Sequence, residues 1–140
     1  MIQAAIGGHE YISLNEKVLT SVEFSLITPE DSNARFVDQY AQLTLTGKIT
    51  PAPVGAEEEL ILSLEHWAAV SDDRAEAYRP LMARVIESGV VLREYKLSDA
   101  YVVNYQVDYN DMEGNGTFIL QVRQRKDRTK NVAVEGGYAS

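Results

Sequence analysis

The chain contains no cysteine and is poor in several other residues that build active sites. Its 140 residues include two histidines, four prolines and one tryptophan. Without cysteine, disulfides, thiolate nucleophiles and thiolate metal ligands are excluded, so the fold must be stabilised by packing alone. No apolar run approaches the roughly 20 residues of a membrane span, and the first residues lack the basic start of a signal peptide. We therefore expect a cytoplasmic protein with no membrane span.

Metal-binding and catalytic motifs are also missing. The two histidines, His9 and His66, have no companion at metal-ligand spacing and no serine and aspartate in a catalytic pattern. The segment 108–116 is rich in Asp, Asn and Gly, but its sixth position holds glutamate where a calcium-binding loop needs glycine. We interpret this segment as a hairpin turn and predict no metal, no cofactor and no enzymatic activity. Because Asp and Glu are plentiful, a cofactor-free enzyme that uses carboxylates remains an alternative.

The formal net charge of −8 argues against nucleic-acid binding, which needs a basic surface to neutralise phosphates. Many of the charges gather in two short stretches. The acidic stretch consists of Glu57, Glu58 and Glu59, and the basic stretch contains Arg123, Arg125, Lys126, Arg128 and Lys130. One interpretation is that both are solvated side chains, as charge runs usually are. The other is that they meet on neighbouring subunits, because opposite patches on one small protein can direct head-to-tail association.

Hydrophobic residues recur at every second position through most of the chain, which is the period of a β-strand. The clearest case is the segments 101–109 and 117–125, which alternate and are joined by Gly and Asn residues, as in an antiparallel hairpin. We expect its tyrosines to pack inside the protein and Asn104, Gln106 and Asp108 to lie on the opposite face. Further strands are expected at 2–6, 10–14, 19–27, 36–49, 60–67, 90–95 and 131–135. The sequence predicts one domain over residues 1–140, a mainly β barrel or sandwich of antiparallel strands.

One segment changes to a helical period. Five residues follow the i, i+3, i+4, i+7, i+8 spacing of a helix face: Tyr78, Leu81, Met82, Val85 and Ile86. Gly89 follows as a stop signal, while Pro80 is tolerated only in a first turn or at a kink. We predict one α-helix around residues 72–88 and expect the tyrosine face of the hairpin to pack against it.

Three stretches of the chain carry a resemblance to a known family. The first, 5–12, is a hairpin around two glycines; the second, 21–35 with 42–48, is two strands and a long polar loop; the third is 97–105 with the hairpin to residue 122. In this arrangement the chain resembles the tube proteins of contractile injection systems, namely the Hcp-type protein of type VI secretion and phage tail-tube proteins.

The resemblance implies a structural protomer without chemistry. Six copies would form a ring, and rings would stack into a tube with sheath, spike and baseplate partners, possible effector cargo and ejection of the particle. On this basis we expect the loop 28–35 to reach the next ring through Glu30, Asp31, Asn33 and Arg35. The two charged stretches would contribute to contacts between subunits, and Asn104, Gln106 and Asp108 would face a lumen or a neighbour. An alternative is an intracellular β-barrel binding module, such as an adaptor, a baseplate or tube-initiator component, or an immunity-type protein.

Overall fold

The computed structural model describes residues 1–140 except 9, 29–38, 50–55, 111, 113–114 and 140, and for residues 56–59 it describes the backbone alone. The strands are β1 (Ile2–Ile6), β2 (Ile12–Leu14), β3 (Leu19–Ile27), β4 (Tyr40–Ile49), β5 (Arg79–Glu87), β6 (Val90–Asn110), β7 (Asn115–Gln124), β8 (Ala133–Glu135) and β9 (Tyr138–Ala139). The α-helix is α2 (Ala56–Ala69), and two short 3-10 helices are η1 (Ala75–Ala77) and η2 (Lys126–Asn131).

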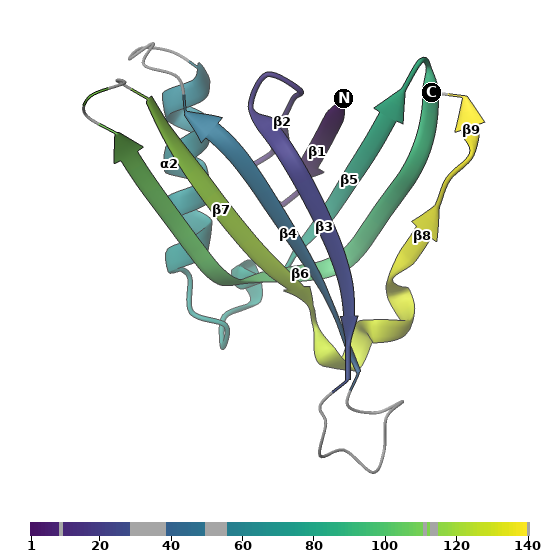
Figure 1. Ribbon diagram of the computed structural model, residues 1–140. Helices are drawn as coiled ribbons and strands as arrows, with labels where there is room; N and C mark the ends of the chain where they lie inside the picture. The colour runs from purple at the N-terminus through teal and green to yellow at the C-terminus, as the bar shows by residue number, and fades with distance from the viewer. Residues whose placement is uncertain (9, 29–38, 50–55, 111, 113–114, 140) are drawn as a thin grey trace.

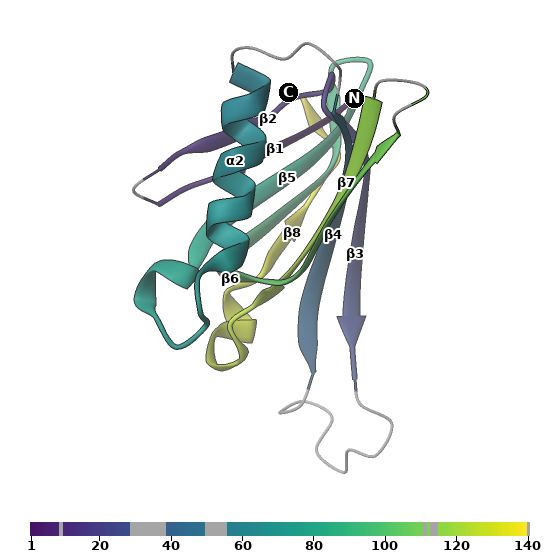
Figure 2. The same ribbon diagram turned by 90° about the vertical axis from the view of Figure 1, so that its left-hand side faces the viewer.

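The strands form one antiparallel sheet in the order β2-β1-β5-β6-β7-β4-β3, which bends at β6 into two layers. The first half of β6 pairs with β5, β8 and β9, whereas its second half pairs with β7. At the bend, Ala100 pairs with both Arg79 and Gln124. Figure 1 shows the two layers opening from this bend, with α2 behind the layer β6-β7-β4-β3, which we call the four-stranded layer. Figure 2 shows α2 running along one side of the strands.

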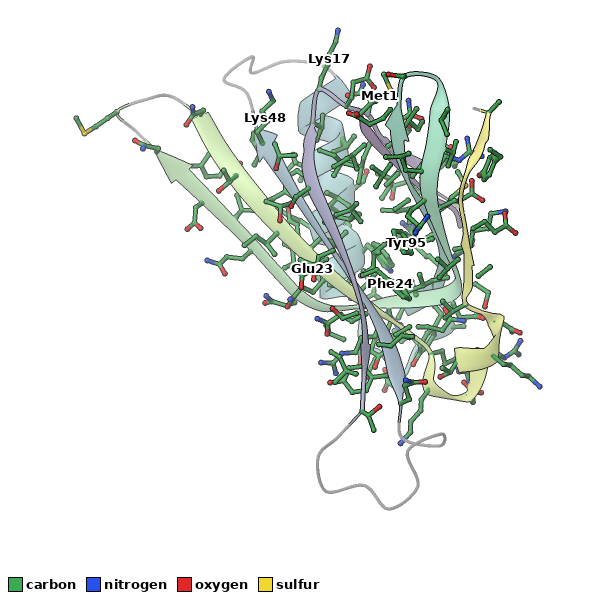
Figure 3. The ribbon with its side chains drawn as sticks, turned by 45° about the vertical axis from the view of Figure 1, so that its right-hand side comes forward. Met1, Lys17, Glu23, Phe24, Lys48 and Tyr95 are labelled. Carbon is green, nitrogen blue, oxygen red and sulfur yellow. The ribbon has the colours of Figure 1, made fainter. Side chains whose placement is uncertain are left out.

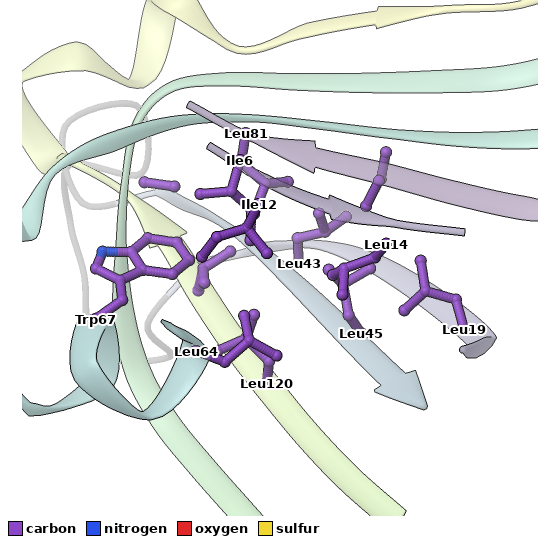
Figure 4. Close-up of a cluster of buried hydrophobic side chains, with 14 of the residues drawn as sticks. Ile6, Ile12, Leu14, Leu19, Leu43, Leu45, Leu64, Trp67, Leu81 and Leu120 are labelled. Atoms are coloured by element: carbon purple, nitrogen blue, oxygen red, sulfur yellow. The ribbon is translucent and has the colours of Figure 1, made fainter. Parts of the chain in front are cut away.

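The core fills the space between the layers and is covered by α2. Along β4, the side chains of Ala41, Leu43 and Leu45 are fully buried, whereas the residues between them are only half-buried. Figure 4 shows how the apolar face of β4 meets side chains of β1, β2, β7 and α2. Burial of one such leucine contributes about 1.5–3 kcal/mol, so this row supplies much of the driving force for folding.

The N-terminal hairpin is confirmed. β1 and β2 pair antiparallel around a turn in which Gly8 has a φ of 111°, a conformation that glycine adopts without strain. The strands expected at 19–27, 117–125 and 131–135 correspond to β3, β7 and β8. Those expected at 90–95 and 100–109 are the two halves of β6, and the one expected at 36–49 corresponds to β4, with 36–38 outside the described residues.

The predicted strand at 60–67 is wrong, because these residues belong to α2. The buried side chains of this segment are Ile61, Leu64 and Trp67, which follow the spacing of a helix face, while Leu62 is 46% exposed. The acidic stretch 57–59 lies in the first turn of α2, where negative charge interacts favourably with the helix dipole. Ala, Leu and Glu also have high intrinsic helix propensity, and together these preferences outweigh a short apolar alternation.

The predicted helix around 72–88 is wrong as well, because residues 79–87 form β5. β5 pairs with β1 and β6 along its two edges, and its consecutive residues 81–86 are all buried or half-buried, so both of its faces are at least partly covered. Leu81 and Ala83 are buried, but Met82 and Val85 on this strand are also half-buried. A strand covered on both faces carries apolar residues on both, and its sequence can then match a helical period by coincidence.

Pro80 fits into β5 because it lies at an irregular position of the sheet. The register between β5 and β6 shifts between Arg79 and Leu81, so the proline, which has no N–H, does not interrupt a regular ladder. Its carbonyl accepts a hydrogen bond from the N–H of Gly7 at 2.8 Å. The proline that argued for a helix start therefore lies opposite a bulge of β6.

The face of the long hairpin is predicted correctly only in part. The register between β6 and β7 shifts between Val102 and Asn104, so the side facing the core changes there. Tyr105 packs against the core, but Tyr101 lies on the other face, where its ring is 5.6 Å from that of Tyr78. Tyr109 is 70% exposed at the end of the strand. The expected packing of all three tyrosines against a helix over 78–86 is therefore wrong.

Candidate assembly surface

The four-stranded layer has one apolar face, turned to the core, and one polar face. The strand registers align polar residues in rows across all four strands, as in the row Glu23, Thr44, Gln121 and Asn104. We define the polar face as Ser21, Glu23, Ser25, Gln42, Thr44, Thr46, Lys48, Asn104, Gln106, Asp108, Thr117, Gln121 and Arg123. Two of these residues are acidic and two are basic, so this face is close to neutral in an acidic protein.

Hydrogen bonds between side chains connect this face. The Gln121 Nε2 group donates to Thr44 Oγ1 at 3.3 Å, and Arg123 Nε donates to Gln42 Oε1 at 3.0 Å, which joins β7 to β4. Cross-strand pairs of this kind stabilise a sheet whose face meets water.

The two faces separate clearly on β3. Figure 3 shows Glu23 and its neighbour Phe24 on opposite sides of the strand. The Phe24 ring stacks on Tyr95 of β6 with 4.7 Å between centroids, so the aromatic side faces the opposite layer. Asn104, Gln106 and Asp108 are exposed on the polar side, as expected for the face opposite the core.

Two edges of the four-stranded layer are unpaired within the described residues. β3 pairs only with β4, and residues 101–109 of β6 pair only with β7. Because every neighbouring pair in the order β6-β7-β4-β3 is antiparallel, the two edge strands run in opposite directions. Large apolar side chains lie exposed on both of them: Leu26 on β3 is 56% exposed and Val103 on β6 is 36% exposed. A long unpaired strand edge is a template for pairing with another chain.

Arginine and tyrosine side chains gather at the end of the layer where β7 ends. The Arg123 guanidinium lies 4.3 Å from the centre of the Tyr40 ring, and that of Arg125 lies 5.0 Å from the Tyr78 ring. With Tyr101, which contacts Tyr78, these residues form what we call the arginine–tyrosine cluster. The strand pairing Tyr101 to Arg123 makes the cluster continuous across β4, β7 and β6.

The helical spacing of the sequence assigned Tyr78 to a helix face, and nothing in that spacing singled out Tyr40. The signal was present, because Tyr40 lies two residues before Gln42 and thus on the same strand face. What the sequence could not supply was the pairing of β4 with β7, which sets Arg123 beside Gln42.

The other end of the layer carries the turn between β6 and β7. Tyr109 is 70% exposed and Met112 is 97% exposed, and both line a shallow open hollow with Asp108. We call Asp108, Tyr109 and Met112 the hairpin tip. Large apolar side chains this exposed, next to polar residues, often mark a contact surface.

The expected interface residues lie at different places in the protomer. Glu30, Asp31, Asn33 and Arg35 lie outside the described residues. Glu57, Glu58 and Glu59 are in the first turn of α2, at the end of the protomer where the hairpin tip lies (Figure 1). Arg123 is near the end of β7, Arg125 follows β7, and Lys126, Arg128 and Lys130 are in η2 at the opposite end (Figure 1). Within one protomer the acidic and basic stretches are therefore far apart.

One buried carboxylate holds the C-terminal strands in place. Glu94 on β6 is 1% exposed and accepts hydrogen bonds from Arg84 Nε at 2.6 Å and from the Tyr138 hydroxyl at 2.5 Å, while Lys96 Nζ lies 3.0 Å away. Burial by itself would raise the pKa of Glu94, but the bonds from Tyr138, Lys96 and Arg84 outweigh it and lower the pKa to about 2. The Glu94 carboxylate is thus fully used in bonds to Arg84, Lys96 and Tyr138, so its role is structural.

In the described part of the chain, no group of three or more acidic or histidine side chains could hold a metal ion. His66 is exposed on α2, not on the strand that was expected there, and His9 lies outside the described residues. None of the described helices combines the length and the apolar character that a membrane crossing requires.

No family model matches the chain. No curated protein matches its sequence either. Solved structures, in contrast, match its fold over nearly the whole length. Hcp1 from Flavobacterium johnsoniae is 14% identical, with a TM-score of 0.54 over 99% of this chain and 99% of that chain. The Hcp1 protein from E. coli EAEC 042 is 10% identical, with a TM-score of 0.57 over 97% of this chain and 98% of that chain.

The chain has the fold of Hcp1. It also matches a chain of the PVC sheath–tube complex of an extracellular contractile injection system in the extended state, at 10% identity and a TM-score of 0.53 over 97% of this chain and 88% of that chain. The expected tube-protein fold, mainly antiparallel β with one α-helix, is confirmed.

Proposed function

We propose that this protein is the inner-tube subunit of a contractile injection system, and that it forms hexameric rings that stack into a tube. The observation that carries the proposal is the four-stranded layer, which has one polar face and two unpaired edges of opposite direction. The likeness to Hcp1 and to a chain of a sheath–tube complex supports the same role.

The edge directions favour a closed ring. A rotation about an axis roughly along the strands brings β3 of one copy beside residues 101–109 of β6 in the next copy, and the two strands are then antiparallel. Repeating this head-to-tail contact closes a ring and removes every unpaired edge of the layer. The exposed side chains of Leu26 and Val103 are covered in the same step.

The two faces of the layer assign an inside and an outside. With the polar face turned inward, the lumen is lined by amide and hydroxyl groups of Gln42, Thr44, Asn104, Gln106 and Gln121. The apolar face and α2 remain in the protomer core, outside the wall. Six copies would contribute about 24 strands, and at about 4.8 Å between strands tilted by about 40° the wall has a diameter of roughly 45–50 Å.

The ends of the protomer fit stacking of rings. The backbone of the first turn of α2, where the sequence places the acidic stretch, lies at one end of the protomer, and η2, where it places most of the basic stretch, lies at the other (Figure 1). Opposite formal charges therefore belong to opposite ends of the protomer, which favours head-to-tail stacking of rings. We infer sheath, spike and baseplate proteins as partners, a tube that can carry effector cargo, and assembly in the cytoplasm before the particle is ejected. In this role the protomer is structural and catalyses no reaction.

The decisive experiment is to image the purified full-length protein by negative-stain electron microscopy and measure its mass by sedimentation. Rings with a central hole and a sixfold mass are expected. A strict monomer across the accessible concentration range would refute the role and favour a binding module.

A disulfide trap tests the edges themselves, because the chain has no cysteine of its own. Glu23→Cys combined with Asn104→Cys or Gln106→Cys should give a ladder of covalent oligomers under oxidising conditions. Within one protomer β4 and β7 lie between these positions, about 14 Å apart at 4.8 Å per strand, so an internal disulfide cannot form. The single variants serve as controls and should give no ladder beyond dimers. Rings without any ladder would place the seam elsewhere while leaving the ring itself intact.

A further inference from the structure

One arginine of the arginine–tyrosine cluster, Arg123, has no ion-pair partner among the described residues. Arg125 pairs with Asp127 at 2.8 Å, but no carboxylate among the described residues lies within ion-pair distance of Arg123. The Arg123 guanidinium is held in position by its stacking on Tyr40 and by its bond to Gln42. A guanidinium fixed in this way keeps free donors for a carboxylate that reaches it from outside.

The composition of the cluster is that of a binding surface. Arginine and tyrosine are enriched among the residues that carry most of the binding energy of protein interfaces. The rings of Tyr40 and Tyr101 also offer flat apolar area, which a methionine sulfur contacts favourably.

The hairpin tip offers the matching groups. Asp108 accepts a bond from Gln106 at 3.2 Å and has no described cation within ion-pair distance. Met112 projects almost completely into solvent, at 97% exposure, and Tyr109 lies beside it at 70%. One carboxylate and one methionine thus face outward together.

These two surfaces cannot meet within one protomer. Tyr101 and Tyr109 lie eight residues apart on the same strand, which is about 26 Å at about 3.3 Å per residue. They lie at opposite ends of the four-stranded layer, so they approach each other only when the end of one layer meets the opposite end of another.

We propose that the hairpin tip of a copy in one ring docks on the arginine–tyrosine cluster of a copy in the adjacent ring. In this contact Asp108 pairs with Arg123, and Met112 packs on the rings of Tyr40 and Tyr101. The contact sets the direction of stacking, because the two surfaces differ and each ring carries the tip on one rim and the cluster on the other. This inference rests on the proposed ring and names the second copy that its ends bind.

The test exchanges the charges of Arg123 and Asp108 and measures the formation of single rings and the stacking of rings separately. Arg123→Glu and Asp108→Arg should each leave single rings intact by sedimentation but lower the fraction of stacked rings, seen by electron microscopy at low salt, about tenfold or more. The variant that carries both changes should regain stacking, since the pair is restored with opposite polarity. Arg93→Glu is the matched control, because Arg93 is exposed on β6 in the other layer and should not affect stacking.

A second variant does not depend on charge. Met112→Cys combined with Tyr40→Cys should join adjacent rings covalently under oxidising conditions, whereas Met112→Cys with Arg93→Cys should not, because Arg93 is exposed on β6 in the other layer. A double charge variant that stacks no better than the single variants, or rings that yield no covalent link, would overturn the inference and leave the ring proposal standing. Wild-type protein that forms no rings at all would refute both.

Discussion

Besides its backbone pairing with β6, the C-terminal strand β9 is linked to the protein by the side chain of Glu94, and this link should make stability depend on pH in acid. The carboxylate is buried and bonded by Arg84, Lys96 and Tyr138, the last of which lies on β9. These bonds require the ionised carboxylate. Protonation of Glu94 therefore weakens the contact that holds β9 on β6.

The magnitude follows from the pKa. The pKa of Glu94 falls from its ordinary 4.5 to about 2 on folding. A folded-state pKa below the unfolded one contributes stability that is fully present above pH 4.5 and is lost as the pH falls toward 2. At 1.36 kcal/mol per pKa unit the whole contribution is about 3 kcal/mol, of which about 2 kcal/mol is lost between pH 6 and pH 3.

Urea unfolding at a series of pH values measures this loss. Trp67, the single tryptophan, is 2% exposed and donates to the Ala77 carbonyl at 2.8 Å, so its fluorescence reports unfolding. At protein concentrations where single protomers sediment, Glu94→Gln should lose about 2 kcal/mol less than wild type between pH 6 and pH 3. Tyr138→Phe, which removes one donor, should fall between the two. Equal pH slopes for wild type and Glu94→Gln would show that Glu94 is not responsible.

Two further substitutions test the core. Gly47→Ala should lower the free energy of unfolding by about 1–3 kcal/mol, because an added Cβ would lie 2.3 Å from the Phe118 ring. Lys48→Ala, at the exposed neighbouring residue, is the control. An unchanged urea midpoint for Gly47→Ala would contradict this packing. Tyr105→Phe should leave the free energy of unfolding unchanged or raise it by up to about 1 kcal/mol. The Tyr105 hydroxyl is buried with no hydrogen-bond partner in the described structure, and burial raises its pKa. A free energy of unfolding lowered by more than about 1 kcal/mol in urea unfolding would indicate that the hydroxyl has a partner.

The sequence predicted most strands and the tube-protein fold but exchanged the one helix with one strand. Alternation identified β3, β4 and β7 because each has one face in the core and one toward water. β5 has neighbours on both sides and cover on both faces, so its apolar residues lost the period of two. The helix had local signals in its helix-favouring residues and its acidic start, but β5 could be recognised as a strand only from what packs against it, which local sequence does not contain.

The assembly surface depends even more on information beyond local sequence. The polar residues Asn104, Gln106 and Asp108 were assigned correctly to the face opposite the core, because alternation is a local property. The tyrosines of the same strand were assigned wrongly at Tyr101, because an irregularity after Val102 changes the face. A single extra residue in a strand cannot be recognised from hydrophobicity when apolar residues occur on both sides of it.

The same irregularity has a consequence for assembly. Had β6 continued without it, Tyr101 would face the core with Tyr105, and Arg123 would lie beside a different side chain on the polar face. The shift places Tyr101 next to Arg123 instead, which completes the arginine–tyrosine cluster at one end of the layer, while Asp108 stays on the polar face at the other end. Deletion of Val103 removes the extra residue but leaves Tyr101 opposite Arg123, Val102 opposite Val122 and Asn104 opposite Gln121, so the variant should keep the cluster and the stacking of rings. Stacking lost in a folded deletion variant, measured by electron microscopy, would show that the pairing of Tyr101 with Arg123 is not sufficient to form the cluster.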